Sequence, residues 1–253
     1  MTTPHRPSDE AGRRPRGPLA RRIVTLAGTP DDASDIDTHL ATIARLAAST
    51  LPPVSYASVT AVRDSAYTTV AASSDLAVAV DQAQYAEDTG PCLDALHDGA
   101  PVGVDDIDTT MAWPGFRQAA ARMGLHASLS VPLFAGSGAT IAVLNLYGHD
   151  PVTLVPLTAR VWAVFDADPA TSPEPDVPLG DAVGDDLITG LVEGFEVRAL
   201  IQRAIGVVMA TQRCTAQDAY LALRVRAAEM GAGLTDVAAR VQQLPRTGGE
   251  PRT

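Results

Sequence analysis

The chain has no lysine, only two cysteines and no long apolar run, and each shortage excludes a class of protein. All 19 basic residues among its 253 are arginines, so P-loop and protein-kinase sites in their usual forms are excluded, because both place a lysine beside nucleotide phosphates. Cys92 and Cys214 are too few for a disulfide framework and stand too far apart for a zinc finger. No apolar run reaches the length of a membrane-spanning helix, and none follows the first arginines as in a signal peptide. We therefore expect a soluble, cytoplasmic protein without a membrane partner.

Charge is distributed unevenly along the sequence. Residues 1–22 carry six arginines against two acidic residues, whereas the rest of the chain carries 13 arginines against 28 acidic residues. With a formal net charge of −11, bulk electrostatics repel nucleic acids and acidic membranes outside the first segment. Residues 1–34 are rich in arginine and proline and are predicted to be disordered.

Residues 35–167 alternate between helical and extended patterns. Apolar residues at helical spacing predict helices at 35–51, 76–86, 92–97, 115–123 and 157–165. Extended patterns predict strands at 56–63, 67–73, 101–107, 126–134 and 140–147. Strands that come in hairpins, with helices before and between them, predict an α+β fold around an antiparallel sheet.

A proline-rich stretch separates this block from a purely helical one. Four prolines among acidic and small residues predict a linker at 168–184. Helices are predicted at 187–211, 216–230 and 234–244, and Thr215 with Asp218 matches a capping box at the start of the second helix. Residues 185–245 are thus expected to form a small all-α bundle of three helices, followed by a disordered tail at 246–253.

The search for catalytic chemistry yields no supported site. The histidines lie far apart in sequence, so we predict no metal site, no cofactor and no enzymatic activity. Cys92, Asp94 and His97 lie close together, but their offsets on a short helix point the three side chains in different directions. We expect Cys92 to pack as a small hydrophobic residue.

Five segments of the central block resemble GAF domains of actinobacterial regulators, in the order that family has them. They are EDTGPCLDAL at 87–96, PVGVDD at 101–106, WPGF at 113–116, SLSVPL at 128–133 and LNLYG at 144–148. The resemblance covers residues 35–167 and implies an antiparallel sheet of five or six strands between helices, with a small-molecule pocket on one face. Four residues lie where that pocket is expected, although each fits sheet packing equally well: Tyr56, Phe116, His126 and Tyr147.

The helical block is similar to a second family, the ANTAR domain. The matching segments are IQRAIGVVM at 201–209, TAQDAYLAL at 215–223 and LTDVA at 234–238. This resemblance implies a three-helix RNA-binding module of bacterial transcription antiterminators. An arginine side chain pairs with a phosphate through two hydrogen bonds or stacks on an unpaired loop base, and an aromatic ring stacks in the same way. The candidate RNA contacts are four arginines and one tyrosine of the helical block: Arg203, Arg224, Arg226, Arg198 and Tyr220.

Together the two resemblances imply a signal-responsive regulator of transcription antitermination. The GAF-like domain would sense an unidentified small ligand, and the ANTAR-like bundle, acting as a homodimer, would bind RNA hairpins in nascent transcripts. The alternative is a protein-interaction or dimerisation regulator whose bundle no longer binds RNA. It is motivated by a neutral bundle, with seven arginines against seven acids in 185–246, and by Gly231-Ala232-Gly233, where family members often carry basic residues.

Overall fold

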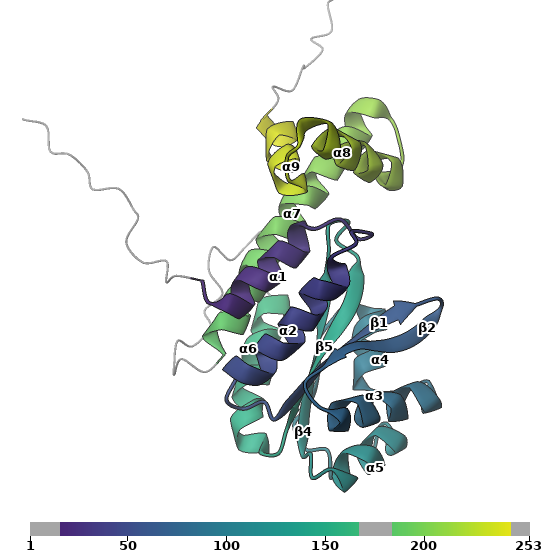
Figure 1. Cartoon of the computed structure of the whole chain (residues 1–253), viewed down its shortest axis with the longest axis vertical. Helices are drawn as coiled ribbons and strands as arrows, with labels where there is room; N and C mark the ends of the chain where they lie inside the picture. The colour runs from purple at the N-terminus through teal and green to yellow at the C-terminus, as the bar shows by residue number, and fades with distance from the viewer. Residues whose placement is uncertain (1–15, 167–183, 244–253) are drawn as a thin grey trace, which may run out of the picture.

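The computed structural model describes residues 16–166 and 184–243 (Figure 1). Within these ranges the helices are α1 (Pro18–Gly28), α2 (Ile36–Thr50), α3 (Asp75–Glu87), α4 (Pro91–Asp98), α5 (Pro114–Arg122), α6 (Pro151–Asp166), α7 (Asp185–Gln212), α8 (Ala216–Met230) and α9 (Leu234–Gln243). The strands are β1 (Tyr56–Arg63), β2 (Ala66–Ala72), β3 (Val102–Val104), β4 (Ala127–Phe134) and β5 (Thr140–Gly148). No helix of the described ranges is long and apolar enough to cross a membrane.

The strands form one antiparallel sheet in the order β2-β1-β5-β4-β3. Asp64 and Ser65 both have positive φ, which makes the two-residue turn between β1 and β2 compatible with the right-handed twist of the strands. The predicted α+β fold around an antiparallel sheet is confirmed. The strand predicted at 101–107 shortens to β3, because only three residues pair with β4 at the edge of the sheet.

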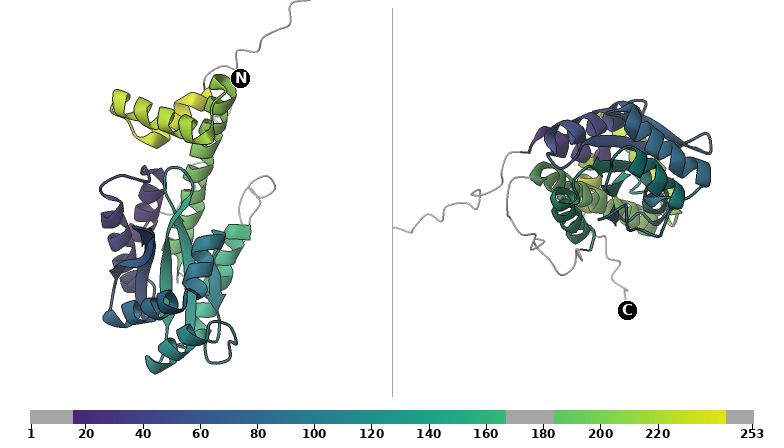
Figure 2. Two further views of the ribbon diagram at one scale, coloured as in Figure 1. Left: turned by 90° about the vertical axis from the view of Figure 1, so that its right-hand side faces the viewer. Right: turned by 90° about the horizontal axis from the view of Figure 1, so that it is seen from below.

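The two faces of the sheet are covered by different helices (Figures 1 and 2). Helices α1, α2, α6 and α7 lie over one face, which is apolar: Ala57, Val59 and Ala61 of β1 and Leu144 and Leu146 of β5 all point into the core there. Helices α3, α4 and α5 lie over the opposite face. Because side chains alternate along a strand, the residues between those apolar positions face α3, α4 and α5.

The N-terminal segment contains a helix that the sequence analysis did not predict. Leu19, Ile23 and Leu26 form one apolar stripe of α1 and are buried against α7. The α1 N-terminus is tied to α7 as well, since the Asp186 carboxylate accepts the backbone N–H of Leu19 at 2.8 Å. The prediction of disorder for residues 1–34 is therefore wrong from residue 18 onward, because the arginine-rich composition obscured a stripe whose partner lies far along the chain.

Helix α7 begins at Asp185, where the bundle was predicted to begin, but it belongs to both units. Its first half contributes Leu187, Ile188 and Leu191 to the core that includes the apolar face of the sheet. Its second half contributes Ile201 and Ala204 to a separate core with α8 and α9. We call the sheet with helices α1 to α6 and the first half of α7 the sheet domain. The second half of α7 with α8 and α9 is the helical bundle. The boundary therefore lies inside α7 rather than before it.

The predicted three-helix bundle is confirmed, with α8 and α9 packed on the second half of α7. Helix α8 begins with the predicted capping box: the Asp218 backbone N–H donates to the Thr215 hydroxyl at 3.2 Å, and the Asp218 carboxylate accepts the Thr215 N–H at 3.3 Å. The linker predicted at 168–184, except for Gly184, and the tail predicted at 246–253 lie outside the described residues.

A cut between the two units should not separate them. If a protease site is engineered between residues 168 and 183 and cleaved, we expect both fragments to co-elute in size-exclusion chromatography, because the first half of α7 is buried in the sheet domain. The matched variant Leu191→Asp should release the C-terminal fragment, since it places a charge in that core. Separate elution without the substitution would contradict the shared core.

Candidate functional site

A layer of polar side chains lies buried between the sheet and helices α3, α4 and α5. From α3, Asp81 and Gln84 reach it, and both are completely buried. The strand residues that form the layer are Ser58, Thr60, Ser128, Ser130, Asn145 and Tyr147, all of them buried. Because buried polar groups are costly unless they are paired, this face is built for specific polar contacts, unlike the apolar opposite face.

Asp81 is the centre of this polar layer. Its carboxylate accepts hydrogen bonds from the Tyr147 hydroxyl at 2.6 Å, the Thr69 hydroxyl at 2.9 Å and the Asn145 amide at 3.3 Å. Burial raises the pKa of Asp81 to about 6, against the lowering effect of these hydrogen bonds. A carboxyl group with such a pKa changes its charge when its surroundings change slightly, as groups at functional sites often do.

Asn145 extends the network across three strands. Its amide nitrogen donates to the Thr60 hydroxyl at 3.1 Å and to the Ser58 hydroxyl at 3.3 Å, and its carbonyl accepts the Ser130 hydroxyl at 3.0 Å. One neighbour stays outside this network: the Ser128 hydroxyl is buried and has no hydrogen-bond partner among the residues that the structure describes. An unpaired buried hydroxyl marks a point where a further polar atom would be accommodated.

Helix α4 closes the layer at one edge through Cys92. The Cys92 backbone N–H donates to the Gln84 side-chain oxygen at 2.9 Å, which fixes the start of α4 against α3. Burial raises the pKa of the Cys92 thiol to about 12. The thiol is therefore protonated at neutral pH, unlike that of a nucleophilic cysteine.

The side chains near Cys92 have separate partners. The Asp94 carboxylate accepts the Trp113 indole N–H at 3.1 Å, and His97 is hydrogen-bonded to the Tyr67 hydroxyl at 3.0 Å. Cys92, Asp94 and His97 thus do not converge on one point. In the ranges that the structure describes, no three histidine, cysteine or acidic side chains gather as metal ligands either.

Three of the four predicted pocket residues come together and one does not. Tyr147 and Phe116 are buried in one cluster beneath α3 and α5, and Tyr56 packs against its edge. His126 lies outside: its ring is 43% exposed and its Nδ1 atom is 2.7 Å from the Asp108 carboxylate. The strand starts one residue later than predicted, so His126 precedes it and turns toward solvent instead of the pocket.

The sequence analysis missed the two central polar residues of the site, Asp81 and Asn145, both of them completely buried. The polar alternation was nevertheless visible in the strand residues, with Ser58 and Thr60 two apart in one strand and Ser128 and Ser130 two apart in another. Asp81 gave no such signal, because a helical aspartate among alanines is usually solvent-exposed. Only the position of α3 over the sheet makes it a central residue.

The predicted RNA contacts fall into two groups. Arg203 on α7 and Arg226 on α8 are exposed on the helical bundle. Arg224 is paired with Asp32 of the sheet domain at 2.6 Å, and the Tyr220 hydroxyl is 3.4 Å from the Asp31 carboxylate.

Arg198 belongs to the second group. Its Nε donates to the Gly138 carbonyl at 2.9 Å, its guanidinium lies 4.0 Å from the centroid of the Phe134 ring, and burial lowers its pKa. Three of the five candidates, Arg198, Tyr220 and Arg224, therefore contact the sheet domain in this structure.

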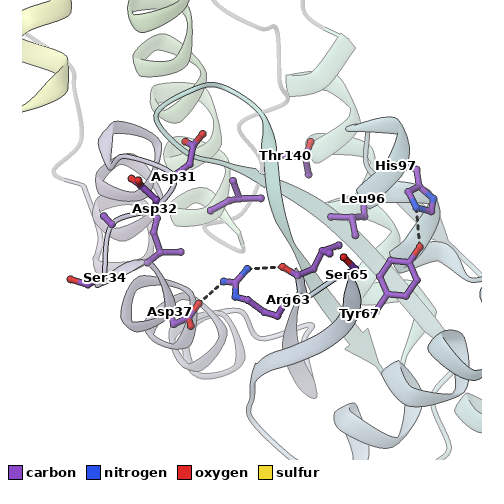
Figure 3. Close-up of a pocket in the computed structure, with 14 residues that line it drawn as sticks. Asp31, Asp32, Ser34, Asp37, Arg63, Ser65, Tyr67, Leu96, His97 and Thr140 are labelled. Atoms are coloured by element: carbon purple, nitrogen blue, oxygen red, sulfur yellow. Dashed lines mark hydrogen bonds and ion pairs between the residues drawn. The ribbon is translucent and has the colours of Figure 1, made fainter. Parts of the chain in front are cut away.

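An open groove of about 790 Å³ lies beside that contact (Figure 3). It runs between the α1–α2 loop and the β1–β2 hairpin. Four of its polar side chains form two pairs: Arg63 with Asp37 at 2.5 Å, and Tyr67 with His97 at 3.0 Å. Asp31 and Asp32 form the rim nearest the bundle.

Comparison with known proteins assigns both parts of the chain. A GAF domain model matches residues 33–164, and an ANTAR domain model matches residues 190–241. No curated protein matches the chain. Similar solved structures include a domain from a protein described as a two-component sensor histidine kinase of Sinorhizobium meliloti 1021, at 13% identity and a TM-score of 0.40, covering 72% of this chain and 100% of that one.

Replacement of Asp81 by asparagine should change how stability depends on pH. The folded-state pKa of Asp81 is raised from 3.8 to about 6, so between these values the folded state holds a proton that the unfolded state has lost. This group therefore makes the free energy of unfolding fall as pH rises through that window, by up to about 3 kcal/mol. Urea unfolding from pH 4 to 7 should show that Asp81→Asn gains stability over the parent as pH rises. The exposed Asp37→Asn is the control, and parallel curves for Asp81→Asn and the parent would contradict the raised pKa.

A side chain at Gly90 should destabilise the sheet domain. A Cβ atom there would overlap the side chain of Gln84, which is fully buried and held by the Cys92 N–H. We expect Gly90→Val to lower the free energy of unfolding by about 1–3 kcal/mol, measured by urea denaturation. Gly206→Ala is the matched control, since no atom lies within 4 Å of its new methyl group. Equal stability of Gly90→Val and the parent would show that α3 and α4 are not held together at this point.

Proposed function

The chain belongs to the GAF domain family and carries an ANTAR domain behind its GAF domain, and from this we propose a signal-responsive regulator of transcription antitermination that senses a small ligand and binds RNA hairpins. One observation carries the proposal. Helix α7 lies in the core of the GAF sheet domain with its first half and in the core of the ANTAR bundle with its second. Because α7 is one rigid helix shared by both cores, a change in the packing of the sheet domain can be transmitted through it to the bundle.

The buried polar layer is the proposed place of ligand recognition. Asp81 and Asn145 offer a carboxyl and an amide, and the unpaired hydroxyl of Ser128 lies on the same face of the sheet. A small polar molecule would take over hydrogen bonds that these groups now make among themselves. Tyr147, Phe116 and Tyr56 would provide the apolar side of such a pocket.

The exposed arginines of the bundle are the proposed first contacts with RNA. Arg203 and Arg226 are exposed on α7 and α8, and an exposed guanidinium pairs with phosphates or stacks on unpaired loop bases. One small bundle offers little surface to a hairpin, so we propose that the chain acts in the cytoplasm as a homodimer. We also propose that it is not an enzyme, which the protonated Cys92 thiol and its separated neighbours support.

A protein-interaction role is the second candidate, and one feature of α8 favours it. Leu221 and Val225 are 54% and 49% exposed on the outer face of that helix, one turn apart. A regulator without RNA affinity would use such a face for self-association or for a protein partner.

Hairpin binding tests the proposal directly. Fluorescence anisotropy with the full chain and a pool of RNA hairpins in low salt should show binding by the parent. Arg203→Ala and Arg226→Ala should each weaken it and lower the slope of log affinity against log salt by about one if the side chain contacts a phosphate. Arg45→Ala, which removes an exposed arginine of α2, should leave both quantities unchanged. Absence of binding by the parent would overturn the RNA-binding function and favour the interaction role.

A further inference from the structure

The helical bundle rests on two adjoining loops at one end of the sheet domain, those joining α1 to α2 and β4 to β5 (Figures 1 and 2). The Gly136 backbone N–H donates to the Thr29 carbonyl at 2.8 Å, and the Ser137 N–H donates to the Asp31 carboxylate at 2.8 Å. The two loops therefore form one surface, with Asp31 at its centre.

Helix α8 meets this surface with Tyr220 and Arg224. The Tyr220 hydroxyl accepts the Asp31 backbone N–H at 3.3 Å and donates to the Asp31 carboxylate at 3.4 Å. One guanidinium nitrogen of Arg224 lies 2.6 Å and 2.8 Å from the two carboxylate oxygens of Asp32. The Arg224 guanidinium is also 5.7 Å from the centroid of the Tyr220 ring. We call these four residues, Asp31, Asp32, Tyr220 and Arg224, the α8 contact.

The α8 side of this contact has the chemistry of an RNA site. A guanidinium binds a phosphate through the same hydrogen bonds that it makes to a carboxylate, and an adjacent aromatic ring stacks on an unpaired base. On the sheet domain, two successive carboxylates present to it the negative charge that an RNA backbone would present. Resting on the proposed RNA-binding function, we propose that Asp31 and Asp32 occupy the place of RNA phosphates, so that the sheet domain and a hairpin compete for Tyr220 and Arg224.

The α8 contact is suited to reversible release. The Asp32 side chain is 65% exposed and that of Arg224 31%, and ion pairs with this much water around them contribute little to stability. A hairpin that offers several phosphates at once can displace two carboxylates held in this way. Free access to Tyr220 and Arg224 then adds to the contacts of Arg203 and Arg226, which are exposed in either state.

The competing surface is connected to the buried polar layer. Arg198 and Gln202 of α7 donate to the carbonyls of Gly138 and Ser137 in the β4–β5 loop. The strands that this loop joins, β4 and β5, carry Ser128, Ser130, Asn145 and Tyr147 farther from the loop, beneath Asp81. A ligand that shifts this hairpin therefore moves the loop that holds the bundle.

Two variants open the α8 contact by different means. Asp32→Asn removes the carboxylate charge that faces Arg224. Gly136→Ala leaves the charge unchanged but places a methyl group 2.7 Å from the Tyr220 hydroxyl and 2.9 Å from both the Leu234 side chain and the Thr29 carbonyl oxygen. The methyl group therefore forces the β4–β5 loop away from the bundle and from the α1–α2 loop. Asp37→Asn is the control, because it removes an equal charge from the same groove, where Asp37 pairs with Arg63 rather than with the bundle (Figure 3).

Hairpin affinity and backbone hydrogen exchange are measured for the full chain in low salt. Asp32→Asn and Gly136→Ala should each raise affinity roughly threefold to tenfold, and both should speed exchange in residues 216–230 without RNA. Asp37→Asn should stay within about twofold of the parent in affinity. Adding Arg224→Ala to Asp32→Asn should remove the gain.

Each other result overturns a defined part of the proposal. Equal gains for Asp32→Asn and Asp37→Asn would mean general charge repulsion, and would overturn competition at the α8 contact. Unchanged affinity in Asp32→Asn and Gly136→Ala, with weaker binding by Arg203→Ala, would overturn the competition alone and leave the RNA-binding function standing. No binding by the parent or by either opened variant would overturn both.

Discussion

Helix α7 has to satisfy two hydrophobic cores at once, and the arrangement of the whole molecule follows from this. Over 28 residues, or about 42 Å of helix, it presents Leu187, Ile188 and Leu191 to one core and Ile201 and Ala204 to the other. Helix α1 covers the first of these stripes and packs closely where Gly190 brings the two backbones together. The GAF and ANTAR units are therefore joined by a shared structural element and not merely by a chain segment. A rearrangement in one core is felt by the same rigid helix in the other.

The two faces of the sheet differ in the side chains that they bury. On one face, apolar residues of β1, β4 and β5 pack against α1, α2, α6 and α7 in one hydrophobic core. The other face buries a connected polar network around Asp81, whose groups need each other or a ligand to be satisfied.

Electrostatics explain why a nearly neutral bundle is compatible with RNA binding. The net negative charge of the chain repels RNA at long range, so the proposed RNA affinity would depend on a few well-placed arginines. The sheet domain holds Arg224 with Asp32 and Arg198 with a backbone carbonyl, whereas Arg203 and Arg226 are exposed. The charge relevant to RNA is thus that of the arginines exposed in a given arrangement of the two units, and the amino-acid composition does not give it.

The sequence by itself determined the local elements, the antiparallel sheet and the two domain families, because periodicity, turn residues and the capping box at Thr215 act over short distances along the chain. It also contained the α1 stripe of Leu19, Ile23 and Leu26, whose significance only its partner α7 reveals. Tertiary structure alone decided that Asp81 is buried, that His126 faces solvent and that Tyr220 and Arg224 meet Asp31 and Asp32. The hydrogen bonds of Asp81 with Asn145 and of Tyr220 with Asp31 join residues 64 and 189 positions apart, and no local pattern records which distant segment a side chain will face.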